Sequence, residues 1–84
     1  MKKHAYRYTI CNQPDEEIFI KQCKAIESRV PITKKHDLIV DVDESKFQRY
    51  DFADGEIIVL NDYEVGYVGV ESDADLTVYF KKSS

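Results

Sequence analysis

Residues 14–30 read PDEEIFIKQCKAIESRV and carry the clearest helical period in this chain. Pro14 suits the first position of a helix, because its missing N–H would have no partner there. The acidic residues that follow Pro14 stabilise the positive end of the helix dipole. Since Pro31 disfavours helical backbone at the residue before it, the pattern predicts an amphipathic helix of about four turns that ends before Pro31. Its apolar residues are Ile18, Phe19, Cys23, Ala25, Ile26 and Val30.

Segments on both sides of this helix have the spacing of β-strands. Residues 4–11 alternate, with Tyr6, Tyr8 and Ile10 on one face, as in a half-buried strand. Residues 56–61 read EIIVLN, and such a nearly continuous apolar run is typical of a central strand covered on both faces. The expected strands are residues 4–11, 37–43, 46–52, 56–61, 64–71 and 76–81, with residues 33–35 as a polar connector.

Residues 46–52, KFQRYDF, fit two structures. Their aromatic content and the Asp54-Gly55 pair that follows predict a strand entering a hairpin, because this dipeptide tolerates the positive φ of a type I′ turn. Phe47, Tyr50 and Asp54 also fit the spacing of a short helix. We favour the strand, although the sequence alone leaves the helix open.

The arrangement of these elements follows from what each must bury. An amphipathic helix has one apolar stripe, and an antiparallel sheet has one face to cover it. We therefore expect an α+β fold, with one N-terminal amphipathic helix packed on a mostly antiparallel, curved, five- to six-stranded sheet in the order β-α-β-β-β-β-β. A parallel, right-handed crossover through the helix would place the N-terminal strand inside the sheet. With 84 residues the chain has too little apolar surface for a second core, so residues 1–84 are expected to form a single domain.

Charge is unevenly distributed along the chain. The net charge is −4, but residues 37–80 hold twelve acidic residues and only two basic ones. A segment this acidic repels phosphate, which argues against nucleic acid as a partner. No apolar run approaches the ~20 residues of a membrane span, so we expect no membrane association. Two cysteines are too few for the disulfide framework of a small secreted domain, and no secretory apolar stretch opens the sequence. We therefore expect a cytoplasmic protein.

No residue pattern indicates catalysis, a metal or a cofactor. Cys23 lies on the apolar stripe of the helix, where cysteine packs as a small hydrophobic residue, and Cys11 ends a strand. Together with His4 and His36 these cysteines match no zinc-binding spacing, and the sequence does not tell whether the four side chains meet in space. The acidic pairs do not match a calcium-binding loop, and the three glycines form no phosphate-binding loop. We therefore expect a non-enzymatic protein without catalytic residues, metal or cofactor.

Tyrosines and carboxylates gather in the same part of the sequence. Tyrosine combines a rigid apolar body with a polar tip and is common at interfaces, and carboxylates around it would attract a basic protein surface. The same tyrosines also fit a thin core with hydroxyls at its rim, and the carboxylates also fit a role in solubility. The candidate partner-binding residues are Asp41, Asp43, Asp51, Asp62, Tyr63, Glu64 and Tyr67.

These observations suggest three functions. The first is a small acidic protein-binding domain, a stoichiometric inhibitor or neutraliser of a basic partner such as a bacterial nuclease, a toxin or a nucleic-acid-binding protein. The second is a homodimeric structural domain, suggested by Ile39 and Ile58, which lie opposite the face assigned to the core. The third is a small acid- or metal-dependent hydrolase, because the acidic residues offer many carboxylate pairs.

Overall fold

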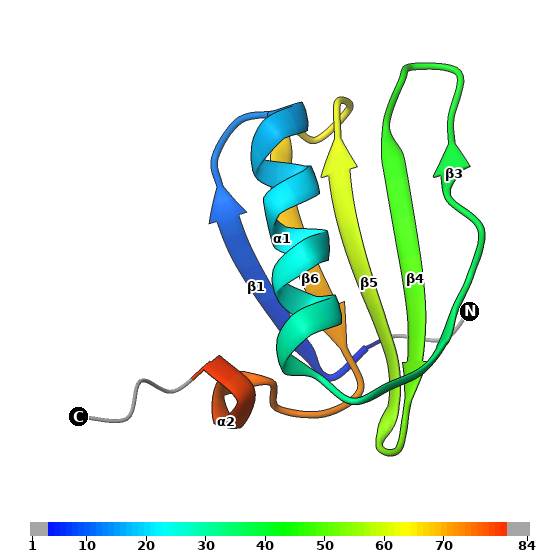
Figure 1. Cartoon of the computed structure of the whole chain (residues 1–84). Coiled ribbons are helices and arrows are strands. Elements are labelled where there is room, and N and C mark those ends of the chain that lie inside the picture. Colours follow the sequence, from blue (N-terminus) through cyan, green and yellow to red (C-terminus); the bar gives the residue numbers. More distant parts are fainter. Residues whose placement is uncertain (1–3, 81–84) are drawn as a thin grey trace.

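The structure is a computed structural model and describes residues 4–80 (Figure 1). One antiparallel sheet carries α1 across one of its faces, which confirms the α+β fold class. The strand order is β1-β6-β5-β4-β2, and the short β3 pairs with the other half of β4. In chain order the elements are β1 (Tyr6–Cys11), α1 (Glu16–Arg29), β2 (Ile32–Lys35), β3 (Ile39–Val40), β4 (Lys46–Phe52), β5 (Gly55–Asp62), β6 (Tyr67–Ser72) and α2 (Thr77–Phe80).

The ends of α1 follow from local chemistry. The Asp15 side chain accepts a 3.0 Å hydrogen bond from the Ile18 N–H and so caps the first turn. Pro14 therefore lies before the cap and not at the first helical position. The helix ends before Val30, whose backbone is extended because Val30 precedes Pro31. The buried residues of α1 are Phe19, Cys23 and Ile26, all from the predicted apolar stripe.

The core lies between α1 and the central strands. Alternate residues of β4, β5 and β6 point toward α1 and are almost fully buried. Tyr50 is completely buried, yet its hydroxyl donates a 2.6 Å hydrogen bond to Oε2 of Glu27 on α1. Burial, together with this bond, raises the pKa of Tyr50. The core residues from the three strands are Tyr50, Phe52, Ile57, Val59, Val68 and Val70.

The sheet edge beyond β4 differs from the sequence prediction. Residues 33–35, expected to be a polar connector, belong to β2, whereas only Ile39 and Val40 of the expected strand 37–43 are paired. Backbone pairing with β4 and not apolar alternation decides this edge, because Lys34 lies opposite Asp51 while its side chain stays in water. Residues 46–52 form β4, as we favoured.

The hairpin between β4 and β5 avoids the expected type I′ turn. Phe52 lies opposite Gly55, and the two residues between them, Ala53 and Asp54, do not have positive φ. The positive φ, +135°, falls at Gly55 instead. A Cβ at this glycine would lie 2.5 Å from Oδ2 of Asp73, so both backbone conformation and space require glycine here.

Both ends of the chain also differ from expectation. β1 lies at an edge of the sheet and pairs only with β6, antiparallel, so it is not inside the sheet and does not pair with β2. The expected last strand, residues 76–81, is the short helix α2, with Lys81 outside the described residues. Asp75 explains this helix, because its Oδ1 accepts hydrogen bonds from the N–H and the hydroxyl of Thr77 and caps the turn. Neither helix within residues 4–80 is long and apolar enough to cross a membrane.

Candidate functional site

The face of the sheet opposite α1, here called the open face, carries a row of apolar positions across the strands. Phe47 lies opposite Leu60, Leu60 opposite Gly69, and Gly69 opposite Thr9. Residues paired in this way point to the same side of a sheet, and they alternate with the core residues that face α1. Ile39 of β3 lies opposite Phe47 and extends the row to the sheet edge.

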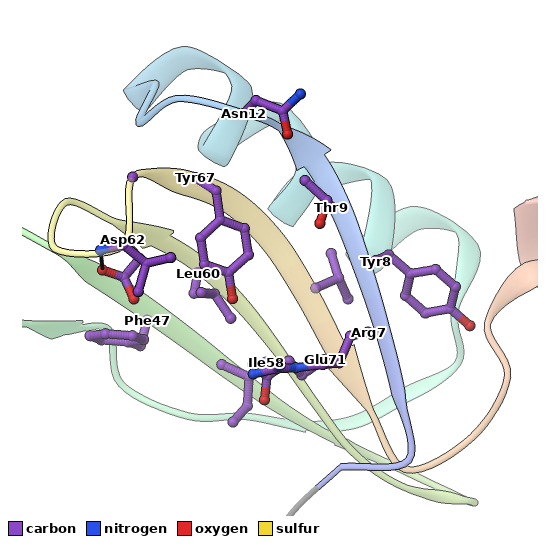
Figure 2. Close-up of a pocket in the computed structure, with 13 residues that line it drawn as sticks. Arg7, Tyr8, Thr9, Asn12, Phe47, Ile58, Leu60, Asp62, Tyr67 and Glu71 are labelled. Atoms are coloured by element: carbon purple, nitrogen blue, oxygen red, sulfur yellow. Dashed lines mark hydrogen bonds and ion pairs between the residues drawn. The ribbon is translucent and has the colours of Figure 1, made fainter.

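A hollow of about 640 Å³ lies on this open face (Figure 2). Leu60 of β5 lies between Phe47 on β4 and the ring of Tyr67 on β6, and Ile58 lies two residues away along β5, beside Glu71. The Tyr67 ring lies close against Gly69, where a Cβ would come within 2.4 Å of Cε2 of Tyr67. Burial, followed by the charge of Glu71, raises the pKa of the Tyr67 hydroxyl. The hollow thus has an apolar part between two aromatic side chains, and polar residues, among them Arg7, Asn12, Asp62 and Glu71, line the rest of it.

Ion pairs border the hollow toward the β4–β5 turn. Arg7 contacts Glu71 at 3.2 Å, and the Nε of Arg49 donates a 3.0 Å hydrogen bond to Oε2 of Glu56. His4 lies between the two carboxylates, with Nε2 2.9 Å from Oε1 of Glu56 and Nδ1 3.4 Å from Oε1 of Glu71. Partial burial raises the pKa of Glu56, but the bonds from Arg49 and His4 outweigh it and hold this pKa below its usual value. The carboxylates on this side are therefore matched by cations.

The opposite end of the hollow meets two adjoining turns. The backbone N–H of Tyr63, in the β5–β6 turn, donates a 2.8 Å hydrogen bond to Oγ of Ser45, in the β3–β4 turn. Each turn is also held by its own carboxylate: Asp43 accepts from the Ser45 N–H, and Asp62 accepts from the N–H groups of Glu64 and Val65. Hydrogen bonds from Ser45 lower the pKa of Asp43. Acidic residues from two turns that are separate in sequence therefore share one surface that hydrogen bonds hold together.

The first turn of α1 lies at the same end of the sheet (Figure 1). Asn61 of β5 accepts a 3.1 Å hydrogen bond from the Asp15 N–H, and Glu16 forms an ion pair with Lys46. We call this region the acidic end. Its carboxylates are Asp15, Glu16, Glu17, Asp41, Asp43, Glu44, Asp62 and Glu64.

Apolar side chains project from the acidic end. Val42 is 100% exposed, Val65 is 74% exposed and Tyr63 is 45% exposed. Val42 lies between Asp41 and Asp43 in the β3–β4 turn, while Val65 also lines the hollow. The acidic end is thus not a purely charged surface. It joins carboxylates, exposed apolar tips and the hollow.

The structure brings together most of the candidate residues from the sequence. Asp41, Asp43, Asp62, Tyr63 and Glu64 lie in the two joined turns, and Tyr67 forms a wall of the hollow. Asp51 lies apart from them, near the other end of β4, with its Oδ2 3.0 Å from Nε2 of His36. Two other tyrosines serve the core: Tyr50 is buried and Tyr79 packs against Phe52.

Sequence reasoning missed the apolar part of this surface. The apolar run of residues 56–61 is typical of a strand covered on both faces, but Ile58 and Leu60 face the hollow, away from α1. Ile58 and Ile39, noted as surplus apolar residues, were the signal that an uncovered face exists. Phe47 and Thr9 carried no such signal, because their place depends on strand order.

Cysteines and histidines do not gather into one site. His4 contacts Glu56 and Glu71, His36 contacts Asp51, and Cys23 lies on the buried side of α1. Burial raises the pKa of Cys23 to about 11, so its thiol stays protonated and weakly nucleophilic at neutral pH. Among residues 4–80, no group of three or more histidine, cysteine or acidic side chains is arranged to hold a metal ion.

Comparison of this chain with protein-family models, curated proteins and solved structures finds no match. The features of the surface are therefore the basis for proposing a function. Its features are the hollow, the ion pairs on one side of it and the acidic end on the other.

Proposed function

We propose that this protein binds a protein with a basic surface, through the acidic end and the adjoining open face. The Tyr63–Ser45 hydrogen bond carries the proposal, because it joins two acidic turns that are eighteen residues apart in sequence. Both turns carry exposed apolar tips among their carboxylates. Carboxylates steer a basic partner and raise its association rate, and apolar contacts then slow its dissociation.

Local charge balance supports an attraction to cations at this end. Glu16 is paired with Lys46 and Glu17 with Lys21, whereas the carboxylates of Asp41, Asp43 and Asp62 are bonded to backbone N–H groups. Backbone N–H groups satisfy hydrogen bonding but do not cancel a full charge. The two turns therefore present a net negative potential, which repels phosphate and attracts lysine and arginine.

We propose a cytoplasmic inhibitor or neutraliser as the concrete form of this activity. Proteins that act on nucleic acids carry basic surfaces that neutralise phosphates. A small acidic protein that occupies such a surface blocks it stoichiometrically, without chemistry of its own. A nuclease, a toxin or a nucleic-acid-binding protein is the class of partner that fits.

The test combines capture with a charge-matched pair of variants. Tagged protein retains its partner from the source lysate at low salt, and the identified partner is then purified for binding measurements. We expect Asp41→Asn/Asp43→Asn to slow association and flatten its salt dependence. Asparagine keeps the oxygen that accepts the turn hydrogen bonds, so the fold is preserved.

Asp54→Asn/Asp75→Asn is the matched control, because it removes the same charge from exposed positions outside the acidic end. Equal association kinetics for both variants would contradict the proposal. A captured protein that binds both variants as tightly as it binds the parent chain does not recognise the acidic end.

A homodimer through β3 is a second candidate. Leu38, Ile39 and Val40 are about half exposed on this edge strand, and exposed apolar edges favour strand pairing between chains. Asp37 and Asp41 flank the strand and would repel an identical edge, which is why we place this candidate second. Light scattering on the purified protein, with no partner added, tests this candidate. A homodimer would show twice the 9.8 kDa mass of one chain.

A further inference from the structure

The hollow on the open face continues directly into the acidic end. Asp62 belongs to both: its side chain holds the β5–β6 turn, and it lines the hollow beside Val65. A segment lying along the open face therefore meets carboxylates at one end and apolar side chains next to them. This continuity links the hollow to the partner of the proposed function.

The lining of the hollow favours an aromatic occupant. Phe47 and Tyr67 lie on either side of Leu60 (Figure 2). Aromatic rings between aromatic walls gain energy beyond the area that they bury. The volume of about 640 Å³ lies in the range of ligand pockets in proteins.

Charge around the hollow gives the occupant a direction. On one side the carboxylate of Glu71 is paired with Arg7, which is itself largely exposed. On the other side Asp62 leads to the turns with Asp41, Asp43 and Glu64, whose charges are not cancelled by nearby cations in the described contacts. Basic residues of an occupant are therefore favoured on the Asp62 side and not beside Arg7.

From this arrangement we infer that the hollow receives an aromatic side chain of the basic partner, carried next to lysine or arginine residues that contact Asp62 and the acidic turns. The inference rests on the proposed function and adds the anchor residue to it. Hot spots of protein interfaces are commonly aromatic side chains in such pockets, with charged residues at the rim.

Synthetic peptides supply defined probes for this inference. The first has one phenylalanine with lysines on one side, the second has alanine in place of phenylalanine, and the third has glutamates in place of the lysines. Each is titrated into 15N-labelled protein. We expect the phenylalanine–lysine peptide to bind about tenfold tighter than the alanine–lysine peptide and to shift the amide signals of Ile58, Leu60 and Tyr67. The alanine–lysine peptide should shift only the two acidic turns.

A variant that fills the hollow distinguishes the contribution of the aromatic side chain to binding from the contribution of charge. Thr9 is exposed on β1 and lines the hollow, so Thr9→Phe places a ring there without removing a buried group. We expect Thr9→Phe to reduce the affinity for the phenylalanine–lysine peptide to that for the alanine–lysine peptide. Thr33→Phe, at an exposed position of β2, is the matched control and should keep the difference. Thermal melting verifies that both variants fold.

The outcomes distinguish the two proposals. Equal affinity for both lysine peptides, lost in Asp41→Asn/Asp43→Asn, would overturn the anchor and leave the proposed function standing. Binding of the glutamate peptide as tight as that of the lysine peptides, or no binding of any, would overturn both. Free indole that binds as tightly as the phenylalanine–lysine peptide would show a small-molecule site and also overturn the anchor.

Discussion

The N–H of Tyr63 donates a 2.8 Å hydrogen bond to Oγ of Ser45, and this bond holds the β5–β6 turn against the β3–β4 turn. Ser45 is only 2% exposed, so water does not readily replace its hydroxyl. The surface that we propose for partner binding therefore depends on one buried, uncharged side chain. Its role is to position the acidic turns.

Ser45→Ala tests this positioning role. The variant leaves the Tyr63 N–H without its acceptor and removes a hydrogen bond to Asp43, so we expect the free energy of unfolding to fall by about 1–3 kcal/mol. Denaturant unfolding measures this loss. If the turns act as one surface, affinity for the lysine peptides also falls in protein that is still folded. An unchanged affinity would show that the turns bind independently.

Tyr50→Phe tests the buried contact between α1 and the sheet. The variant removes the hydrogen bond from Tyr50 to Glu27, which is the first cause of the lowered pKa of Glu27. We expect the pKa of Glu27 to rise toward its usual value, and stability at neutral pH to fall by about 1 kcal/mol. NMR titration of the Glu27 side chain follows the first change and denaturant unfolding the second. A pKa that stays lowered would assign the effect to Lys35 instead.

At low pH the protein should lose the stability that the ion pairs of Glu56 on the open face contribute. Its pKa is lowered in the folded state, so its ion pairs contribute stability above the unfolded pKa of about 4.3, and that contribution is lost as pH falls through the folded pKa. Glu56→Gln should reduce the pH dependence of stability below about pH 4.3 and lower stability at pH 7. Thermal melting across this range measures both. A slope equal to that of the parent chain would contradict the role of Glu56.

Two glycines provide a matched test of the hairpins. Gly55 has φ +135° and its Cβ position is occupied by Asp73, whereas Gly66 has φ +88° and open space around it. Gly66→Ala should cost about 1 kcal/mol from backbone strain alone. Gly55→Ala should cost more, because Asp73 must also move. Denaturant unfolding of both variants gives the comparison, and an equal cost would show that Asp73 adjusts freely.

Elements with a strong local signal were predictable from sequence. The stripe of Phe19, Cys23 and Ile26 and the stop at Pro31 are local features, and α1 follows from them. The edge elements were not predictable in this way. β2 exists because its backbone pairs with β4, and α2 exists because Asp75 caps a turn, so neither depends on an apolar period.

Only the part of the candidate surface that has a local signal could be predicted from the sequence. Acidic residues next to Tyr63 are visible in the sequence, but their union with the β3–β4 turn depends on the Ser45 hydroxyl. The hollow depends on strand order, which places Thr9 and Phe47 on either side of Leu60 and Gly69. The sequence of one strand does not show which distant strand it pairs with, so the hollow could not be predicted from either strand alone.

The exposed valines Val42 and Val65 allow a test of whether the acidic end binds a partner or serves only solubility. If the carboxylates serve solubility alone, Val65 and Val42 are incidental, and their replacement should change nothing but hydration. If the acidic end binds a partner, they are contacts, and Val42→Ser/Val65→Ser should weaken binding of the identified partner at least severalfold. Both side chains are exposed, so stability should change by less than about 0.5 kcal/mol.

Val78→Ser is the control for this pair, because Val78 is 69% exposed on α2, away from the acidic end. Calorimetric titration of the partner into the three proteins compares them, and we expect the control to bind as the parent chain does. Equal affinity of the double variant and the control would assign the carboxylates to solubility. Loss of affinity confined to the double variant would show that apolar contact at the acidic end contributes to binding beyond charge.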